Sequence, residues 1–540
     1  MKTPTGNSLF YGDNLEVLRE HLADDSVDLV YLDPPFNSNA SYNVLFKEPE
    51  GHRSQAQIEA FDDTWHWTDA AERAFDEVMR SGNSEAAEML RAMRGFLREN
   101  DLMAYLAMMA VRLIELHRVL KPSGALYLHC DPTASHYLKI LLDAVFGKGR
   151  FVNEITWKRS HAHSDHKQGA THYGRLSDRI LYYAKSEQHI WNVQYTAYSQ
   201  EYVARDYRRV EPDGRCYRLD NIQGPGGAEK GNPYYEVMGV SRHWRYSRKR
   251  MEELIARGLV VQTRPGAVPQ LKRYLDEMPG VPLQDIWTDI DIINNRSKEL
   301  LGYPTQKPVA LLERIVAASS NEADLVLDPF CGCGTTLHAA AKLNRRWIGV
   351  DITHLAINLI RKRLRGAFPE LAFDIVGVPK DLDGARALAG QDKYEFQKWV
   401  LSMLDAVPYK GGKKGGDGGV DGYVYFKPDG KTTEKAVVSV KGGASLTPAM
   451  VKDLIVTVDQ QGAKMGFFVT LEAPTKGMIA QAAAAGFYVT EFGRFAKIQI
   501  VEVASLFAPA NPLQMPWQDT SAFKPTARES TVRQSELDLD

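Results

Sequence analysis

The chain has 540 residues, of which 44% are hydrophobic and 25% are charged, and its formal net charge is −2. This composition is ordinary for a globular protein of roughly three or four domains and excludes a uniformly basic one. No apolar run reaches the roughly 18 residues of a membrane span, and the N-terminus lacks the pattern of a secretion signal. The four cysteines, Cys130, Cys216, Cys331 and Cys333, show no zinc spacing, which predicts a reducing, cytoplasmic location.

The first 150 residues alternate between runs that are typical of strands and runs that are typical of helices. Residues 8–11, 27–32 and 125–129 are expected to be strands, and residues 15–21, 102–120 and 135–146 are expected to be helices. Residues 37–100 are polar and are expected to be irregular. Strand–helix alternation predicts a parallel sheet with helices on its faces.

The strand at 27–32 is followed by Asp33-Pro34-Pro35-Phe36. An exocyclic amine is a poor nucleophile because its lone pair is delocalised, so a methyl-transferring site needs acceptors for both amine hydrogens. The Asp33 carboxylate and the Pro34 carbonyl, on a turn that Pro34 and Pro35 stiffen, suit that task. Phe36 offers a ring on which a flipped base can stack. The alternative is a strand that ends in an ordinary Pro-Pro turn.

Residues 156–290 interrupt the alternation and are rich in Arg, Lys, His, Tyr and Gly. Lys158, Arg159, Arg242 and Arg245 are candidate DNA contacts, because cations interleaved with aromatic rings suit phosphate contact and base stacking. The alternative for the second cluster is a solvated basic helix that Trp244 anchors in a core. The histidines between residues 161 and 172 fit no strong zinc pattern.

Alternation returns with a helix at 309–318, strands at 325–327 and 347–350, and helices at 337–343 and 354–364. The loop after the strand at 325–327 carries Gly332 and Gly334. Glycines let a backbone approach a ligand closely, and the helix that follows offers free N–H groups. Asp351, at the end of the next strand, is placed to bind ribose hydroxyls. The pattern predicts a nucleotide-type cofactor, and the alternative is a tight turn.

Together, the Asp33–Phe36 segment and the Asp328-Pro329-Phe330-x-Gly332-x-Gly334 loop resemble the base pocket and the S-adenosylmethionine loop of amino-group DNA methyltransferases. Their order is that of the beta, circularly permuted arrangement. The resemblance implies an α/β, Rossmann-like sheet built from residues 1–155 and 291–368, with a target-recognition insertion at 156–290. It implies that Asp33, Pro34, Pro35 and Phe36 form the catalytic pocket. It implies cofactor contacts by Asp13, Lys307, Asp328, Phe330, Gly332, Gly334, Thr335 and Asp351.

Residues 33–67 and 285–290 also resemble the modification subunits of type III restriction systems. This likeness implies duplex DNA as the substrate and restriction-system subunits as partners, and a homodimer is a further expectation. Asp at the first pocket position favours adenine N6 over cytosine N4. A non-catalytic DNA-binding scaffold is the alternative from another class.

Residues 367–390 are expected to be a connector, 391–508 a third unit, and 509–540 a disordered or loosely docked tail. In the third unit, Asp421 and Lys441 on successive strands, with Glu395 on a helix, resemble the Mrr-like branch of the restriction-endonuclease fold. The likeness implies Mg²⁺ at Asp421 and DNA cleavage, which would make a combined modification–restriction enzyme. Ser439 departs from the pattern, because this position normally carries Glu, Asp or Gln. A domain that only binds DNA or a partner is the alternative.

Overall fold

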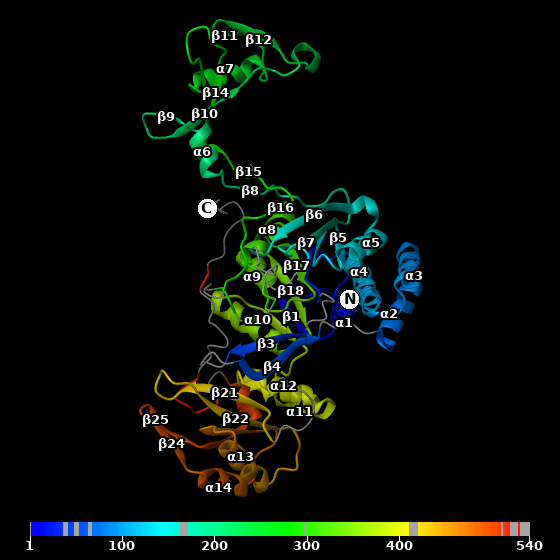
Figure 1. Cartoon of the computed structure of the whole chain (residues 1–540), viewed down its shortest axis with the longest axis vertical. Helices are drawn as coiled ribbons and strands as arrows, with labels where there is room; N and C mark the ends of the chain where they lie inside the picture. The colour runs from blue at the N-terminus through cyan, green and yellow to red at the C-terminus, as the bar shows by residue number, and fades with distance from the viewer. Residues whose placement is uncertain are drawn as a thin grey trace. The chain divides into compact units, whose positions relative to one another are not determined.

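The computed structural model describes residues 2–35, 41–47, 53–62, 67–161, 171–294, 297, 299–301, 303, 305–409, 419–508, 511–518 and 528–529, with only the backbone at 41–47 and 53–62. It divides into two compact units (Figure 1). One is Val193–Gln284, and the other comprises the described residues on both sides of it. None of the helices in these ranges is long and apolar enough to cross a membrane.

A nine-stranded sheet forms the centre of the larger unit, counted over the described residues. Its order is β16 (Ile286–Trp287), β6 (Phe151–Lys158), β7 (Ser177–Ala184), β5 (Leu120–Cys130), β2 (Val27–Leu32), β17 (Leu325–Asp328), β18 (Arg346–Asp351), β1 (Ser8–Tyr11) and β19 (Asp374–Val376). The strands from β5 to β19 pair in parallel, whereas β7 is antiparallel to both β5 and β6. The sheet therefore interleaves strands from both halves of the chain, which confirms the predicted α/β fold.

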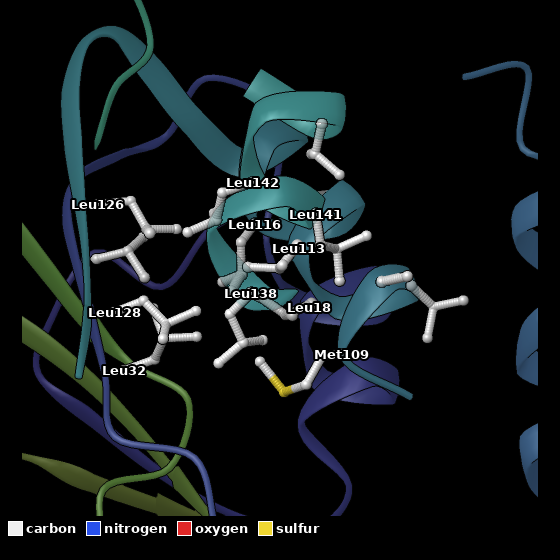
Figure 2. Packing of buried hydrophobic residues seen from close by; sticks show 14 of the residues in the cluster. Leu18, Leu32, Met109, Leu113, Leu116, Leu126, Leu128, Leu138, Leu141 and Leu142 are labelled. Atoms are coloured by element: carbon white, nitrogen blue, oxygen red, sulfur yellow. The ribbon is translucent and has the colours of Figure 1, made fainter. Parts of the chain in front are cut away.

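Helices cover both faces of this sheet (Figure 1). On one face, α1 (Asn14–His21), α4 (Asp101–Val119) and α5 (Ser135–Phe146) pack on the strands through leucine side chains (Figure 2). The other face carries α8 (Val309–Ser319), α9 (Thr335–Lys342) and α10 (His354–Ala367), which contact β5, β17, β18 and β1. A strand that is covered on both faces has a mostly continuous apolar sequence. β2 is such a strand, because all of its residues are buried.

The structure differs from the prediction between residues 37 and 100. Instead of irregular chain it has the hairpin β3 (Ser41–Lys47) and β4 (Arg53–Asp62) and the helices α2 (Asp69–Arg80) and α3 (Ser84–Leu97). Half of the residues that the two helices bury are alanines, and the others are Phe75, Val78, Leu90 and Met93. The expected connector also has structure, because β19 pairs with β1 and α11 (Leu382–Gln391) packs into the C-terminal core.

The predicted insertion at 156–290 is wider than the compact unit Val193–Gln284, because β6, β7 and β16 pair in the central sheet. That unit contains the helices α6 (Gln200–Asp206) and α7 (Arg248–Ala256). It also has a four-stranded sheet of β13 (Val260–Val261), β14 (Gln270–Tyr274), β10 (Cys216–Asn221) and β9 (Arg209–Val210), and two antiparallel pairs of strands. These pairs are β11 (Tyr234–Val237) with β12 (Val240–His243), and β8 (Tyr195–Thr196) with β15 (Val281–Pro282). Trp244 is fully buried in its core.

The C-terminal part of the larger unit has a second sheet, ordered β20 (Val407–Pro408), β21 (Gly422–Lys427), β22 (Glu434–Lys441), β23 (Met465–Thr470) and β26 (Ile498–Glu502). Helices α11 and α12 (Lys393–Met403) pack on one face, and α13 (Pro448–Gln460) and α14 (Lys476–Ala484) pack on the other. A hairpin of β24 (Phe487–Thr490) and β25 (Gly493–Ala496) follows α14. In the tail, β27 (Trp517–Gln518) pairs with β21, and Glu529 pairs with His338.

Candidate cofactor and target-base site

Four parallel strands bring the predicted site residues to one edge of the central sheet. Because β2, β17, β18 and β1 run in the same direction, their carboxyl ends meet, and a ligand crevice is expected there. Asp33 follows β2, Asp328 and Asp351 end β17 and β18, and Asp13 follows β1. They line one cavity of about 370 Å³, which lies in the range of small-molecule sites. Residues from distant parts of the chain therefore share one site.

The loop between β17 and α9 has the backbone that the glycines predicted. Gly332 and Gly334 have φ angles of 50° and 73°, in the left-handed region that favours glycine. A Cβ on Gly334 would lie 2.8 Å from the Ile360 side chain, and one on Gly332 would lie 3.2 Å from the Tyr303 ring. Gly334 is also the N-cap of α9, so the free N–H groups of that helix begin at the cavity. Both positions therefore require glycine.

Two of the acidic strand ends, Asp328 and Asp351, have raised pKa values. Burial raises the pKa of Asp328 to about 7 although Thr336 and the Phe330 N–H donate to its carboxylate. Burial also raises the pKa of Asp351 to about 6. Asp351 accepts from the Thr353 N–H and hydroxyl at 2.8 Å and from the Gly332 N–H at 3.0 Å. Buried carboxylates of this kind favour a cationic ligand, which would stabilise their ionised forms.

Asp13 is held by the helix that follows it and by an arginine that the sequence analysis did not single out. Its Oδ1 accepts from the Leu15 N–H at 2.7 Å, which caps α1. Arg112, on α4, donates from Nη2 to both Asp13 oxygens at 3.2 Å and from Nε to the Asn14 side chain at 2.6 Å. A lone cation in the apolar run of α4 was the sequence signal for this contact.

The base-pocket turn lies beside the cofactor loop. The Lys307 ammonium forms an ion pair with Asp33, so a residue expected to contact the cofactor contacts the expected catalytic carboxylate. Pro35 lines the cavity and Pro34 is buried next to it. Phe36 lies outside the described residues. The Thr335 hydroxyl donates to the Lys307 carbonyl at 3.2 Å, which links the lead-in segment to α9.

A buried polar chain beneath the pocket was also missed. The Tyr31 hydroxyl, which lines the cavity, lies 2.9 Å from His129 Nδ1, and His129 Nε2 lies 3.1 Å from Asp178. Arg159, a predicted DNA contact, pairs with the other Asp178 oxygen at 3.1 Å. These partners come from β2, β5 and β7 and from the segment after β6. The chain thus connects the floor of the cavity to a candidate DNA-binding side chain.

Of the other candidate DNA contacts, Arg242 and Arg245 are exposed and Lys158 is partly buried. Lys158 ends β6, and in the Val193–Gln284 unit Arg242 and Arg245 are exposed on either side of buried Trp244. The Trp244 indole donates to the Tyr235 carbonyl, so Trp244 is a core anchor and does not stack on bases. The described residues contain no group of three His, Cys, Asp or Glu side chains that could hold a metal.

The C-terminal candidates divide between two sites. Asp421 accepts from Gln397 Nε2 at 2.5 Å and from the Val440 N–H at 2.6 Å, and it lies across from the strand that carries Ser439 and Lys441. Glu395, on the same helix as Gln397, instead accepts from the Tyr11 hydroxyl at 2.7 Å and pairs with Lys398. The helical residue at Asp421 is therefore Gln397, which the sequence analysis did not name.

Comparison with known proteins identifies the larger part of this architecture. The sequence profile of the DNA methylase family matches residues 27–362, which is more than half of the chain. The chain belongs to the DNA methylase family. A second profile, described as restriction endonuclease, matches residues 388–498.

Two relatives found by sequence agree with this assignment. The chain is 30% identical over 361 residues to the type II methyltransferase M.EcaI of Enterobacter cloacae, covering 66% of this chain and 69% of the relative. It is 28% identical to the Mod subunit of the type III enzyme StyLTI of Salmonella typhimurium, covering 63% of this chain and 50% of the subunit. Among solved structures, the cytosine-N4-specific PvuII DNA methyltransferase matches with 13% identity and a TM-score of 0.33, covering 67% and 86% of the two chains.

This DNA methylase is of the restriction-modification type and uses S-adenosylmethionine, as the sequence predicted. The fused restriction-endonuclease domain confirms the second predicted likeness. The individual roles of the site residues stay predictions. What the structure adds is that Asp13, Asp33, Lys307, Asp328, Phe330, Gly332, Thr335 and Asp351 line a single cavity.

Proposed function

We propose that this DNA methylase transfers the methyl group of S-adenosylmethionine to N6 of adenine in duplex DNA. The observation that carries the proposal is the position of Asp33, a carboxylate at the end of β2 in the cavity that the cofactor loop lines. The bound cofactor supplies an electrophilic methyl carbon on a cationic sulfonium. The buried Asp328 and Asp351 carboxylates suit that charge.

The residues of the chain orient the target amine. In the proposed site, the Asp33 carboxylate and the Pro34 carbonyl accept its two hydrogens, which favours a tetrahedral nitrogen with an available lone pair. Lys307, which pairs with Asp33, holds that carboxylate toward the cavity. Phe36 stacks on the flipped base. Asp, rather than Ser, at position 33 favours adenine over cytosine N4, the second candidate target.

A pair of matched variants tests the pocket. Asp131 also precedes a proline at the end of the neighbouring strand β5, but it does not line the cavity. We expect Asp33→Ala to abolish incorporation of labelled methyl into plasmid DNA and Asp131→Ala to retain most of it. Equal activity in the two variants would contradict the assignment of Asp33.

We propose that the Val193–Gln284 unit contributes to target recognition, with the exposed Arg242 and Arg245 contacting phosphates. Restriction-system subunits and a second copy of the chain are proposed partners. A cytoplasmic location rests on the cysteines, all four of which are free thiols.

A second candidate function is DNA cleavage by the C-terminal domain, which the restriction-endonuclease match favours. Asp421 is the carboxylate proposed to hold Mg²⁺, with Lys441 on the next strand. The described residues do not form a multi-carboxylate metal site, because they contain no group of three metal-binding side chains. Mg²⁺-dependent plasmid nicking that disappears in Lys441→Ala would support this function. Nicking that persists in the variant, or no nicking by the wild type, would refute it.

A further inference from the structure

Arg112 occupies a position that no part of the proposed reaction explains. It is only 5% exposed, although it is an arginine in the middle of the apolar helix α4. Burying a guanidinium is costly unless its donors are satisfied, and burial lowers the pKa of Arg112 despite the neighbouring Asp13 carboxylate. The side chain also lines the cofactor cavity. A buried cation at a ligand cavity calls for a functional reason.

The hydrogen bonds of Arg112 run to both sides of that cavity. Nη2 donates to both oxygens of Asp13, which follows β1. Nε donates to the Asn14 side-chain oxygen at 2.6 Å, and the Asn14 amide donates to the Pro329 carbonyl of the cofactor loop at 2.8 Å. Nη1 donates to the Met108 carbonyl of its own helix at 3.0 Å. One planar group therefore fixes a carboxylate on one wall and the glycine loop on the other.

Asp13 both caps α1 and faces the cavity, so the orientation of its carboxylate matters. Its Oδ1 caps α1 by accepting from the Leu15 N–H, so Oδ2 is the oxygen with acceptor capacity left for a ligand. The Asp13 side chain is 39% exposed, so packing alone does not fix it. The Arg112 Nη2 group, which donates to both oxygens of Asp13, supplies the missing constraint.

We propose that Arg112 is a positioning residue that makes the cofactor site selective for adenine, by holding Asp13 as a fixed acceptor for the exocyclic amine of the cofactor. This rests on the proposed function and on the family resemblance, which implies that Asp13 faces the adenine ring of the cofactor. A carboxylate held in this way accepts from an amine, whereas it meets the carbonyl oxygen of hypoxanthine with repulsion and no hydrogen bond. The hypoxanthine compound loses this hydrogen bond and leaves a polar group unpaired. The site should therefore bind the adenine compound roughly 10- to 100-fold more tightly.

The test compares binding of S-adenosylhomocysteine with that of S-inosylhomocysteine, which differs only in carrying hypoxanthine, by titration calorimetry on the full-length protein. We expect the wild type to prefer the adenine compound by about 10- to 100-fold and Arg112→Met to prefer it by less than about threefold. Arg112→Lys keeps the charge but has one donor group, which cannot bond Asp13, Asn14 and the Met108 carbonyl together, so its preference should lie between those of the wild type and Arg112→Met. Arg118→Met is the matched control, because Arg118 is a partly buried arginine of α4 that pairs with Asp24 and Glu115 outside the cavity.

The outcomes separate the inference from the function on which it rests. A reduced preference in both Arg112 variants, with an unchanged preference in Arg118→Met, supports the inference. If the Arg112 variants bind both compounds more weakly by the same factor, Arg112 has only a structural role, and the inference is overturned. Equal binding of the two compounds by the wild type would also overturn it while leaving the methyltransferase function intact. No binding of either compound by the wild type would overturn the proposed cofactor site itself.

Discussion

Replacing Asp328 by Asn should stabilise the ligand-free methyltransferase domain while weakening cofactor binding. Asp328 is 3% exposed, and burial raises its pKa from the ordinary 3.8 to about 7, with Asp33 and Asp351 adding repulsion. Asn has almost the same shape and carries no charge. The substitution therefore removes the cost of ionising a buried carboxyl and leaves the packing in place.

The sign and size follow from the pKa values. Between pH 4 and 7 the folded protein holds a proton on Asp328 that the unfolded chain has released, so the unfolding free energy falls as the pH rises through this window. A difference of about 3 pH units, at about 1.4 kcal/mol for each, gives up to about 4 kcal/mol by pH 8. The Asn amide needs a partner of its own, which costs about 1–2 kcal/mol at either pH, so we expect a net stabilisation of roughly 2–3 kcal/mol at pH 8 and a net destabilisation of about 1–2 kcal/mol at pH 4.

Scanning calorimetry measures this effect on the transition that S-adenosylhomocysteine shifts, since a chain with several domains does not unfold in one step. Asp328→Asn should melt several degrees above the wild type at pH 8 and a few degrees below it at pH 4. A gap between the two proteins that does not change with pH, or a more stable wild type at pH 8, would refute the reasoning. The gain in stability should come with lost cofactor affinity, as is common for strained sites.

Three further predictions follow from the same contacts. The pKa values of Asp328 and Asp351 are raised to about 7 and about 6, so both groups become ionised between pH 5 and 8. The affinity for cationic S-adenosylmethionine should therefore rise roughly tenfold or more over this range. Titration calorimetry that shows the same affinity at both pH values would contradict this. Removing both Arg242 and Arg245 should lower the slope of log affinity for DNA against log salt by about 2 without changing the methylated base, and an unchanged slope would exclude them as phosphate contacts. Asp178→Ala removes the buried carboxylate that pairs with His129 and Arg159. It should lower the free energy of unfolding by about 3 kcal/mol, measured as a lower melting temperature. A shift of less than one degree would show that the buried polar chain contributes little to stability.

The sequence predicted the sheet and its interleaving because both depend on local patterns. Strands such as β2 and β17 are short apolar runs, and each is followed by the Asp-Pro segment that marks its carboxyl end. Two such segments on parallel strands must meet at one edge, so the shared cavity was within reach of sequence reasoning. Helices α2 and α3 were missed although the sequence carried a signal for them. The buried residues of α2, Ala71, Ala74, Phe75 and Val78, recur at helical spacing.

The polar contacts between distant segments could not be predicted. Arg112 meets Asp13 across 99 positions, and Lys307 meets Asp33 across 274, so no spacing rule connects them. Glu395 was predicted because it matches the acid that the resemblance places on that helix, and Gln397 was not considered. Side chains two residues apart on a helix point to nearly opposite faces. Only the packed structure shows that Gln397 contacts Asp421 while Glu395 contacts Tyr11.

The identity of the methylated base tests the central claim most directly. Purified protein is incubated with unmethylated plasmid and S-adenosylmethionine, and the DNA is digested to nucleosides for mass spectrometry, with Asp33→Ala as the control. We predict N6-methyladenine from the wild type and none from the variant. N4-methylcytosine would contradict the choice of base, and the absence of any methylated base from a protein that binds the cofactor would contradict the proposed activity.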